Sequence, residues 1–312
     1  MFCRNAFEFL EIQPGGKAYL CCPSWLPVEL DLNNIGEEWN SPKVQKIRKS
    51  FLEGNYAFCT EHCPLVVEHG RDNPKEDGIL VSSGPKRIKF SFDRECNLYC
   101  KSCREFRSEY TEQDRRKSQE ILQILEDHFS SSVERIDLSG SGDPFFSYTL
   151  RNWMKKFSRE KYPNLKHVHL HTNALLWTPT MWSIVEPITP YIKSAEISID
   201  AACKETYSKV RRGGSWEKLQ ENLRFIDTLM LQDLCFSFVV QKDNYKEIVD
   251  FYDMCSKAMQ MTPFSIRYAQ VLDWGVPYFQ DLDCFQDSKI VGEIKEQIQE
   301  VKKHTRVYSD IV

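Results

Sequence analysis

The chain has 312 residues, of which 41% are hydrophobic and 28% are charged, and its formal net charge is -4. This length and composition suit a folded protein with one large core and room for a small satellite domain. The negative charge excludes the overall basic field with which nucleic-acid-binding proteins neutralise phosphate. We therefore expect no nucleic-acid partner, although a local basic groove stays open.

The N-terminal sequence MFCRNAFEFL lacks the basic stretch and apolar run of a secretory signal, and no later apolar run approaches the roughly 18–20 residues that cross a bilayer. We therefore expect a cytoplasmic protein without a membrane partner. Twelve cysteines is a high number for such a chain. Because disulfides rarely persist in the cytosol, clustered cysteines indicate metal binding or redox chemistry.

Residues 1–67 are rich in cysteine, and we expect them to be poor in strands and to form a small separate domain. Within them the segment SPKVQKIRKSFLEG predicts a helix, with Ser41 as N-cap, Pro42 in the first turn and Gly54 as the stop. Residues 68–86 are polar with Gly and Pro breakers, which predicts a linker.

Six short runs rich in β-branched and aromatic residues follow the linker, and long amphipathic segments separate them. The six runs are RIKFSF, VERIDLS, HVHLHT, AEISID, FSFVV and SIRYAQV. This alternation predicts parallel βα units in an α/β fold, either an open sheet or a barrel. We assign residues 87–280 to this domain, as an incomplete (β/α)6 barrel, and residues 281–312 to a C-terminal helical segment.

Polar and glycine-rich loops follow these strands, where parallel βα proteins carry their chemistry. The first strand leads into CNLYCKSC, with Cys96, Cys100 and Cys103, and the second into SGSGDP at residues 139–144. The third ends in HTNA, the fourth in Ser198 and Asp200, and the fifth in residues 240–244. We expect all five loops to face one mouth.

Three thiolates can hold three corners of a four-iron, four-sulfur cluster and leave one iron open. In its C-x3-C-x2-C spacing the chain resembles the radical S-adenosylmethionine (SAM) superfamily over roughly residues 87–280. The resemblance implies that Cys96, Cys100 and Cys103 hold a catalytic 4Fe-4S cluster whose open iron binds SAM. It further implies reductive cleavage of SAM to a 5'-deoxyadenosyl radical that removes a substrate hydrogen, with a flavodoxin- or ferredoxin-type electron donor.

The resemblance also implies a set of SAM-binding residues. SGSGDP resembles the glycine-rich motif of the superfamily, with Asp143 in the place where a glutamate is commoner, contacting the methionine amino group. ISIDA and RRGG resemble the segments that hold the ribose and carboxylate. The expected cofactor-binding residues are Gly140, Ser141, Gly142, Asp143, Asn173, Ser198, Asp200 and Arg211. One departure is Ser102, where the superfamily usually has an aromatic residue near the adenine.

A zinc site is the plainer interpretation of three close cysteines, but it normally needs a fourth Cys or His, and none suitable occurs before Tyr110. A glycine-rich turn such as SGSGDP is by itself often only structural. Its position one βα unit after the cysteines favours the functional interpretation.

The N-terminal cysteines form a second constellation that resembles the SPASM or "twitch" extension of radical SAM enzymes, which binds auxiliary iron-sulfur clusters. That extension usually follows the barrel, whereas here it precedes it. Four thiolates from Cys3, Cys21, Cys59 and Cys63 would fill all four iron corners of one auxiliary 4Fe-4S cluster. Cys22 is the alternative to Cys21, and a structural zinc ion is the alternative to iron.

From the resemblance we expect a radical SAM oxidoreductase or isomerase that modifies a peptide by oxidation, crosslinking or epimerisation. The alternative substrate is a small molecule, a carbohydrate or aminocyclitol that is oxidised or epimerised. An alternative of another class is a non-catalytic iron-sulfur or zinc protein, which would not cleave SAM.

Overall fold

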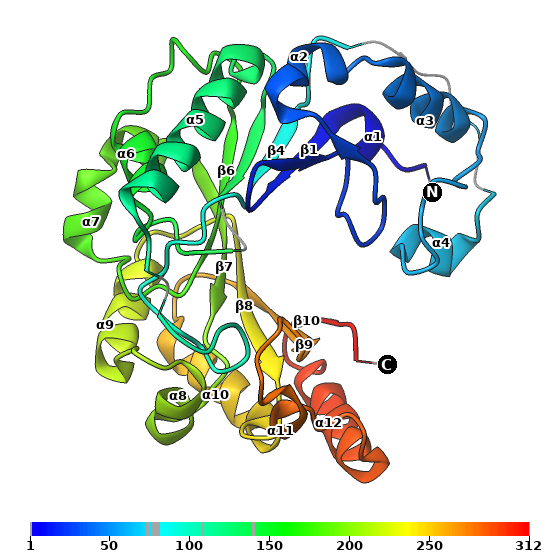
Figure 1. The fold of residues 1–312 in the computed structure, drawn as a ribbon. Helices are drawn as coiled ribbons and strands as arrows, with labels where there is room; N and C mark the ends of the chain where they lie inside the picture. The colour runs from blue at the N-terminus through cyan, green and yellow to red at the C-terminus, as the bar shows by residue number, and fades with distance from the viewer. Residues whose placement is uncertain (1, 73–74, 76–81, 108, 139–140, 312) are drawn as a thin grey trace. The chain divides into compact units, whose positions relative to one another are not determined.

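The computed structural model describes residues 2–72, 75, 82–107, 109–138 and 141–311. The chain divides into two compact units, each built from several segments (Figure 1). The first unit comprises Met1–Arg94, Tyr110–Ser141 and Lys156–Val168, and the second comprises Glu95–Glu109, Gly142–Lys155 and His169–Val312. The boundary expected after residue 67 does not coincide with a boundary between these units.

The first unit contains a sheet in the order β3-β2-β1-β4-β5. Its strands are β1 (Phe9–Gln13), β2 (Lys17–Tyr19), β3 (Glu29–Leu30), β4 (Arg87–Phe90) and β5 (Arg135–Leu138). Strand β4 is parallel to both β1 and β5, whereas β1, β2 and β3 form an antiparallel meander. The N-terminal segment therefore contributes three short strands of five, three and two residues to this sheet.

Five α-helices accompany this sheet: α1 (Asn5–Glu8), α2 (Ile35–Glu38), α3 (Pro42–Leu52), α4 (Pro64–His69) and α5 (Glu112–Phe129), with the 3-10 turn η1 (Leu32–Asn34) before α2. Helix α3 confirms its predicted signals, since the Ser41 hydroxyl accepts a hydrogen bond from the Val44 N–H and Gly54 has a φ of 79°. Trp39 packs edge-on against Phe129 of α5, with 5.9 Å between ring centroids. These contacts join the N-terminal residues to the first βα unit in one core.

The second unit contains parallel strands β7 (Ile192–Ser198), β8 (Asp233–Val240), β9 (Phe264–Gln270) and β10 (Arg306–Ser309). Strand β6 (His167–Thr172) crosses the division, and its last four residues belong to this unit beside β7. All six predicted strands are present as β4 to β9. Strand β10 lies in the segment expected to be helical, after helix α12 (Ser288–Val301), and it extends the sheet beyond β9.

Alternate side chains of these strands are buried under helices. The elements between and after the strands are α6 (Tyr148–Lys155), α7 (Pro179–Ile184), η2 (Glu186–Tyr191), α8 (Lys204–Val210), α9 (Trp216–Asp227), η3 (Tyr245–Glu247), α10 (Ile248–Ala258), α11 (Phe279–Leu282) and α12 (Ser288–Val301). Helices α9, α10 and α12 follow one another around the outside of β7 to β9 (Figure 1). Phe238 of β8 packs on Phe251 of α10 at 4.8 Å.

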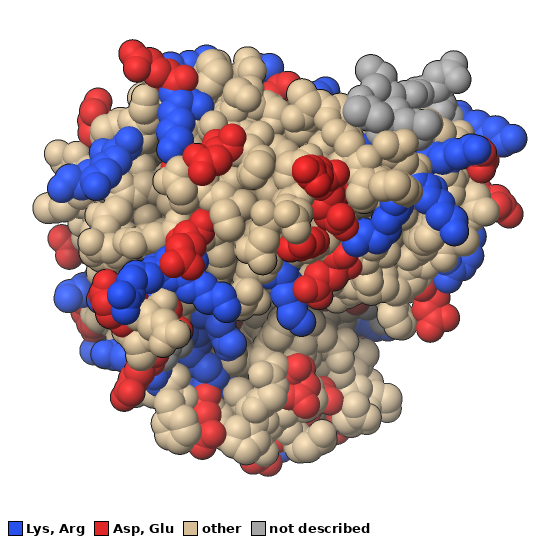
Figure 2. All heavy atoms as spheres, turned by 45° about the horizontal axis from the view of Figure 1, so that its top comes forward, with Lys and Arg blue, Asp and Glu red and all other residues tan. Residues whose placement is uncertain are grey.

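The α/β class with mainly parallel strands is confirmed, and closure into an incomplete barrel stays a prediction. In the described parts of the chain, no helix combines the length and apolar character needed to cross a bilayer. Basic and acidic side chains are interspersed on the face drawn in Figure 2, in keeping with the small net charge.

Candidate active site

The three cysteines of the C-x3-C-x2-C motif lie in one loop of the second unit, after β4. Cys100 is buried, Cys96 is half-buried and Cys103 is exposed. The Cys103 N–H donates to the Cys100 carbonyl at 2.9 Å, which curls the loop into a turn. Burial raises the pKa of the Cys96 thiol to about 12, and the nearby charges of Asp143 and Cys100 add to the effect. Burial likewise raises the pKa of Cys100, and the nearby Asp200 and Cys103 add to the effect.

The segment after α8 holds this loop in place. The Tyr99 N–H donates to the Arg212 carbonyl at 3.1 Å, and the Lys101 N–H donates to the Val210 carbonyl at 2.9 Å. The Arg212 side chain returns hydrogen bonds to the carbonyls of Tyr99 at 3.0 Å and Arg104 at 2.7 Å, and it lies over the Tyr99 ring. The sequence analysis named Arg211 but missed Arg212. Nothing in the motif RRGG indicates that the second arginine binds the cysteine loop, which lies far earlier in the chain.

Replacing Arg212 with Met is expected to loosen the cysteine loop, because each hydrogen bond from a charged group contributes about 1.5–3 kcal/mol. The measurement is limited proteolysis of the loop together with the iron content of the reconstituted chain, and we expect faster cleavage and less iron. Lys209→Met, at an exposed position one turn earlier, is the matched control. Equal cleavage rates in both variants would contradict the clamp.

Asp200 and Arg211 are brought together beside the cysteine loop. Asp200 follows β7 with a φ of 59°, and its carboxylate accepts from the Val239 N–H at 2.8 Å and pairs with Arg211 at 2.8 Å. Burial alone would lower the pKa of Arg211, but the Asp200 and Cys100 charges outweigh it and raise the pKa. Arg211 also donates to the Cys100 sulfur at 3.5 Å. Ser198, two residues before Asp200, lies 3.0 Å from His171 Nε2.

Asp143 and Asn173 lie beside Cys96, whereas Asp200 and Arg211 lie beside Cys100. The buried Asp143 carboxylate accepts from the Thr172 hydroxyl at 2.7 Å and from the N–H groups of Asn173 at 2.9 Å and Phe145 at 3.1 Å. Its carboxylate thus braces the end of β6, and its contact to SAM stays a prediction. The Asn173 amide donates to the Cys96 sulfur at 3.8 Å.

The other predicted SAM-binding residues of the glycine-rich motif are Gly140, Ser141 and Gly142. Gly140 lies outside the described residues, as does Ser139. Ser141 ends a segment of the first unit, and Gly142 begins a segment of the second. A SAM-binding role for all three residues stays a prediction.

The residues around the motif fit a cluster bound by three thiolates. In the described parts of the chain, no three His, Cys, Asp or Glu side chains are arranged around one point as they would be around a bound ion. Two of the three thiols nevertheless already receive hydrogen bonds from Asn173 and Arg211, as ligand sulfurs in iron-sulfur proteins do. Among the described residues, the buried Arg211 Nε has no hydrogen-bond partner, so it has a donor to offer a ligand beside Cys100.

Four of the five N-terminal cysteines, Cys3, Cys21, Cys59 and Cys63, line one cavity of about 120 Å³ in the first unit. The apolar side chains of Trp25, Leu26, Phe51, Pro64 and Leu65 complete its wall together with Asn5. Burial raises the pKa values of Cys21 and Cys59 to about 12. The Asn5 amide donates to the Cys21 sulfur at 3.2 Å, whereas the half-buried Cys22 is not among the lining residues. The structure thus brings together Cys3, Cys21, Cys59 and Cys63.

One face of the strands in the second unit is polar, and of its side chains the sequence analysis assigns a role only to Ser198. Polar side chains on this face include His169, His171, Ser194, Glu196, Ser198, Ser237 and Arg267. His169 Nδ1 lies 2.7 Å from the Ser194 hydroxyl, and Arg267 lies 3.8 Å from Glu196. Burial would raise the pKa of Glu196, but His171 and Arg267 outweigh it and lower the pKa. The strict alternation in HVHLHT and SAEIS is the signal that could have identified this face.

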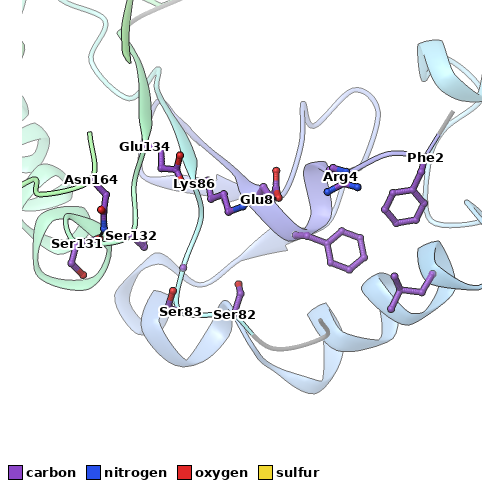
Figure 3. A pocket seen from close by; sticks show the side chains of 13 residues that line it. Phe2, Arg4, Glu8, Ser82, Ser83, Lys86, Ser131, Ser132, Glu134 and Asn164 are labelled. Atoms are coloured by element: carbon purple, nitrogen blue, oxygen red, sulfur yellow. Dashed lines mark hydrogen bonds and ion pairs between the residues drawn. The ribbon is translucent and has the colours of Figure 1, made fainter. Parts of the chain in front are cut away.

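A larger hollow of about 480 Å³ lies in the first unit at the amino ends of β1, β4 and β5 (Figure 3). Two of its charged lining residues, Lys86 and Glu8, point toward one another and pair at 3.2 Å. In parallel βα proteins the active loops follow the carboxyl ends of the strands, so this hollow is at the wrong end for the chemistry.

Comparisons with known proteins agree with the motif. The family model described as the radical SAM superfamily matches residues 90–255, which is more than half of the chain. A probable GTP 3',8-cyclase of Methanocaldococcus jannaschii is 22% identical over 223 residues, covering 69% of this chain and 68% of that protein. The GTP 3',8-cyclase of Alkaliphilus metalliredigens is 24% identical over 215 residues, covering 68% of this chain and 63% of the relative.

Among solved structures, methylornithine synthase aligns with a TM-score of 0.43 at 13% identity, covering 72% of this chain and 71% of that one. From the extent of the family match, together with three cysteines in one loop at the end of a parallel strand, the chain belongs to the radical SAM superfamily.

Proposed function

We propose that this enzyme reductively cleaves SAM and uses the resulting 5'-deoxyadenosyl radical to remove a hydrogen atom from its substrate. A 4Fe-4S cluster held by Cys96, Cys100 and Cys103 would supply the electron, and its open iron would bind SAM. The observation that carries the proposal is the contact of this loop with segments following two other strands. Asn173, after β6, donates to Cys96, and Arg211, which is paired with Asp200 after β7, donates to Cys100.

The chain's own residues orient and shield this site. The carboxylate of Asp200 fixes the Arg211 guanidinium, and Asp143 fixes the backbone of Asn173. Buried thiols with raised pKa values stay protonated until a metal displaces their protons, so cluster binding releases protons.

The test is formation of 5'-deoxyadenosine when the anaerobically reconstituted chain receives dithionite and SAM. We expect 5'-deoxyadenosine and methionine by chromatography. A chain with a complete reduced cluster that leaves SAM intact would contradict the proposal and favour the non-catalytic alternative. A flavodoxin- or ferredoxin-type protein is the proposed donor in place of dithionite.

We also propose that Cys3, Cys21, Cys59 and Cys63 bind an auxiliary 4Fe-4S cluster. Support comes from the cavity that these four side chains line and from its apolar wall. Four protein thiolates leave no open iron, so this cluster would transfer electrons or stabilise the fold.

Replacing Cys59 with Ala is expected to remove the auxiliary metal, because a complete cluster needs all four thiolates. Metal analysis should fall from about eight irons to about four per chain, on the basis of one four-iron cluster per site. Cys22→Ala is the control and should retain all the iron. Loss of one zinc instead of four irons would show that the site is a structural zinc site.

For the substrate, the polar face of β6 to β9 favours the carbohydrate or aminocyclitol over the peptide. Hydroxyl, imidazole, carboxylate and guanidinium groups line this face, and they suit a substrate rich in hydroxyl groups. The named relatives likewise act on a small molecule, GTP. A peptide substrate stays a prediction that rests on the SPASM resemblance.

The test is the stimulation of 5'-deoxyadenosine formation by myo-inositol, glucosamine, GTP or a mixture of short peptides. We expect stimulation by a hydroxylated small molecule and its loss in Arg267→Met. Stimulation by the peptides alone would return the assignment to peptide modification.

A further inference from the structure

One face of the sheet in the first unit carries charged side chains on three neighbouring strands. Glu11 of β1 lies opposite Lys89 of β4, and Lys89 in turn lies opposite Asp137 of β5. Two residues earlier on each strand, Arg87 of β4 lies opposite Arg135 of β5. Because alternate residues of a strand point to the same face, these five side chains share one face. All five belong to the first unit.

The carboxylates of this face are buried, whereas the cations are partly exposed. The side chains of Glu11 and Asp137 are each 4% exposed, but that of Arg87 is 46% exposed. Those of Lys89 and Arg135 are 33% and 34% exposed. Lys89 pairs with Glu11 at 3.2 Å, and Asp137 accepts from Arg87 Nε at 2.6 Å and from Arg135 Nε at 2.7 Å. The carboxylates therefore hold cations that stay accessible to a ligand.

Asp137 offsets only one of the two guanidinium charges that it holds. The five side chains comprise three cations and two carboxylates, which leaves one positive charge in excess. Like charges directly opposite one another on neighbouring strands destabilise a sheet, so stability alone does not favour Arg87 opposite Arg135. Arg87 is fixed further by Phe9, whose ring centre lies 5.0 Å from the guanidinium carbon. Two fixed guanidinium groups suit the oxygen atoms of a phosphate or a carboxylate.

A buried hydroxyl group continues this face toward the carboxyl end of β4. The Ser91 N–H donates to the Ile12 carbonyl at 2.9 Å, which extends the pairing of β1 with β4. Ser91 lies two residues after Lys89 and so on the same face. Its side chain is buried, and among the described residues its hydroxyl has no hydrogen-bond partner. A buried polar group without a partner is unfavourable, so this hydroxyl indicates a missing ligand.

We propose that Arg87, Lys89, Ser91 and Arg135 bind an oxyanion group, a phosphate or a carboxylate, of a small molecule. Arg87 contacts Asp137 through Nε and Nη2, and Arg135 donates to it through Nε. The other N–H groups of the two guanidiniums would bind the oxygen atoms of the ligand, and the Ser91 hydroxyl would donate to one of them. The proposal goes beyond SAM cleavage, because none of these residues holds a cluster.

The test is calorimetric titration of the reconstituted full chain with inorganic phosphate and with malonate, at constant ionic strength. We expect one ion per chain and binding at least about tenfold weaker in Arg135→Met, because charge-assisted hydrogen bonds are lost. Lys166→Met is the matched control, since it breaks an exposed pair with Glu134 and should bind the ion normally. Tighter binding of phosphate would identify the ligand as a phosphate ester, and tighter binding of malonate as a carboxylate.

Ser91→Ala separates binding from stability. The hydroxyl has no partner in the free chain, so its removal should leave the urea midpoint unlowered and still weaken binding of the ion. This variant decides the question even if Arg135→Met does not fold. No saturable binding of either ion, or equal affinities in the unchanged chain and Ser91→Ala, would overturn the proposal.

The result is independent of SAM cleavage. The chain in which the three motif cysteines are replaced by Ala should bind the ion with unchanged affinity. Loss of binding in that chain would place the ion on the iron of the cluster and overturn the proposed site.

Discussion

Replacing Cys96, Cys100 and Cys103 together with Ala is expected to abolish formation of 5'-deoxyadenosine and to leave the metal of the N-terminal site in place. The three thiols share one loop, which a hydrogen bond from the Cys103 N–H to the Cys100 carbonyl curls into a turn, and the variant removes all three sulfur atoms. Without them no iron is held where SAM would bind. The measurement combines metal analysis with chromatography of the SAM reaction, and we expect about four irons and no product.

The control for this experiment is Cys203→Ala. Cys203 is half-buried and belongs to neither group of cysteines, since its sulfur contacts Thr206 and Glu247 at 3.6 Å. This variant should keep about eight irons and full SAM cleavage, on the basis of two four-iron clusters. If the triple variant still cleaved SAM, the motif would not be the site of the chemistry.

Replacing Arg211 with Met is expected to destabilise the second unit by about 3–5 kcal/mol, which is the usual effect of removing one partner of a buried ion pair. Asp200 and Arg211 are both buried, and the lost guanidinium leaves a carboxylate facing Cys100 without its cation. The measurement is the urea midpoint of the metal-free chain. We expect the midpoint to fall sharply in Arg211→Met.

The double variant Asp200→Asn with Arg211→Met tests whether the unpaired Asp200 charge causes the loss of stability. It removes both charges, so it should recover part of the loss. Lys204→Met provides the control, because it breaks an exposed pair with Glu217 and should leave the midpoint unchanged. A double variant as unstable as Arg211→Met would show that packing, and not the uncompensated charge, causes the loss.

The sequence predicts the central strands well because each is an apolar run between helix signals. All six runs form strands β4 to β9, and HVHLHT matches β6 at both ends. The strands that the sequence analysis missed form because they pair with strands that are distant in the sequence. Strand β1 follows a single helical turn and pairs with β4 some 78 positions later, and the four-residue β10 is defined by its pairing with β9.

In the candidate site too, the sequence predicts residues that belong to a local motif and misses residues that act through contacts with distant segments. Spacing alone identifies Cys96, Cys100 and Cys103, and the scarcity of persistent cytosolic disulfides identifies the N-terminal cysteines. The sequence cannot choose between Cys21 and Cys22, because adjacent side chains diverge; in the structure only Cys21 lines the cavity. Arg212 acts through contacts with the cysteine loop that no spacing rule describes.

The clamp on the cysteine loop also sets an order of events during synthesis. Tyr99 leaves the ribosome 113 residues before Arg212, which later binds its carbonyl. At about 5–20 residues per second this interval lasts roughly 6–23 s. Throughout it the nascent chain carries all three thiols without the segment that fixes their loop. We therefore expect iron to be held at the motif only after the second half of the protein has been translated, and a chain that stops before residue 210 lacks the hydrogen bonds that hold the cysteine loop.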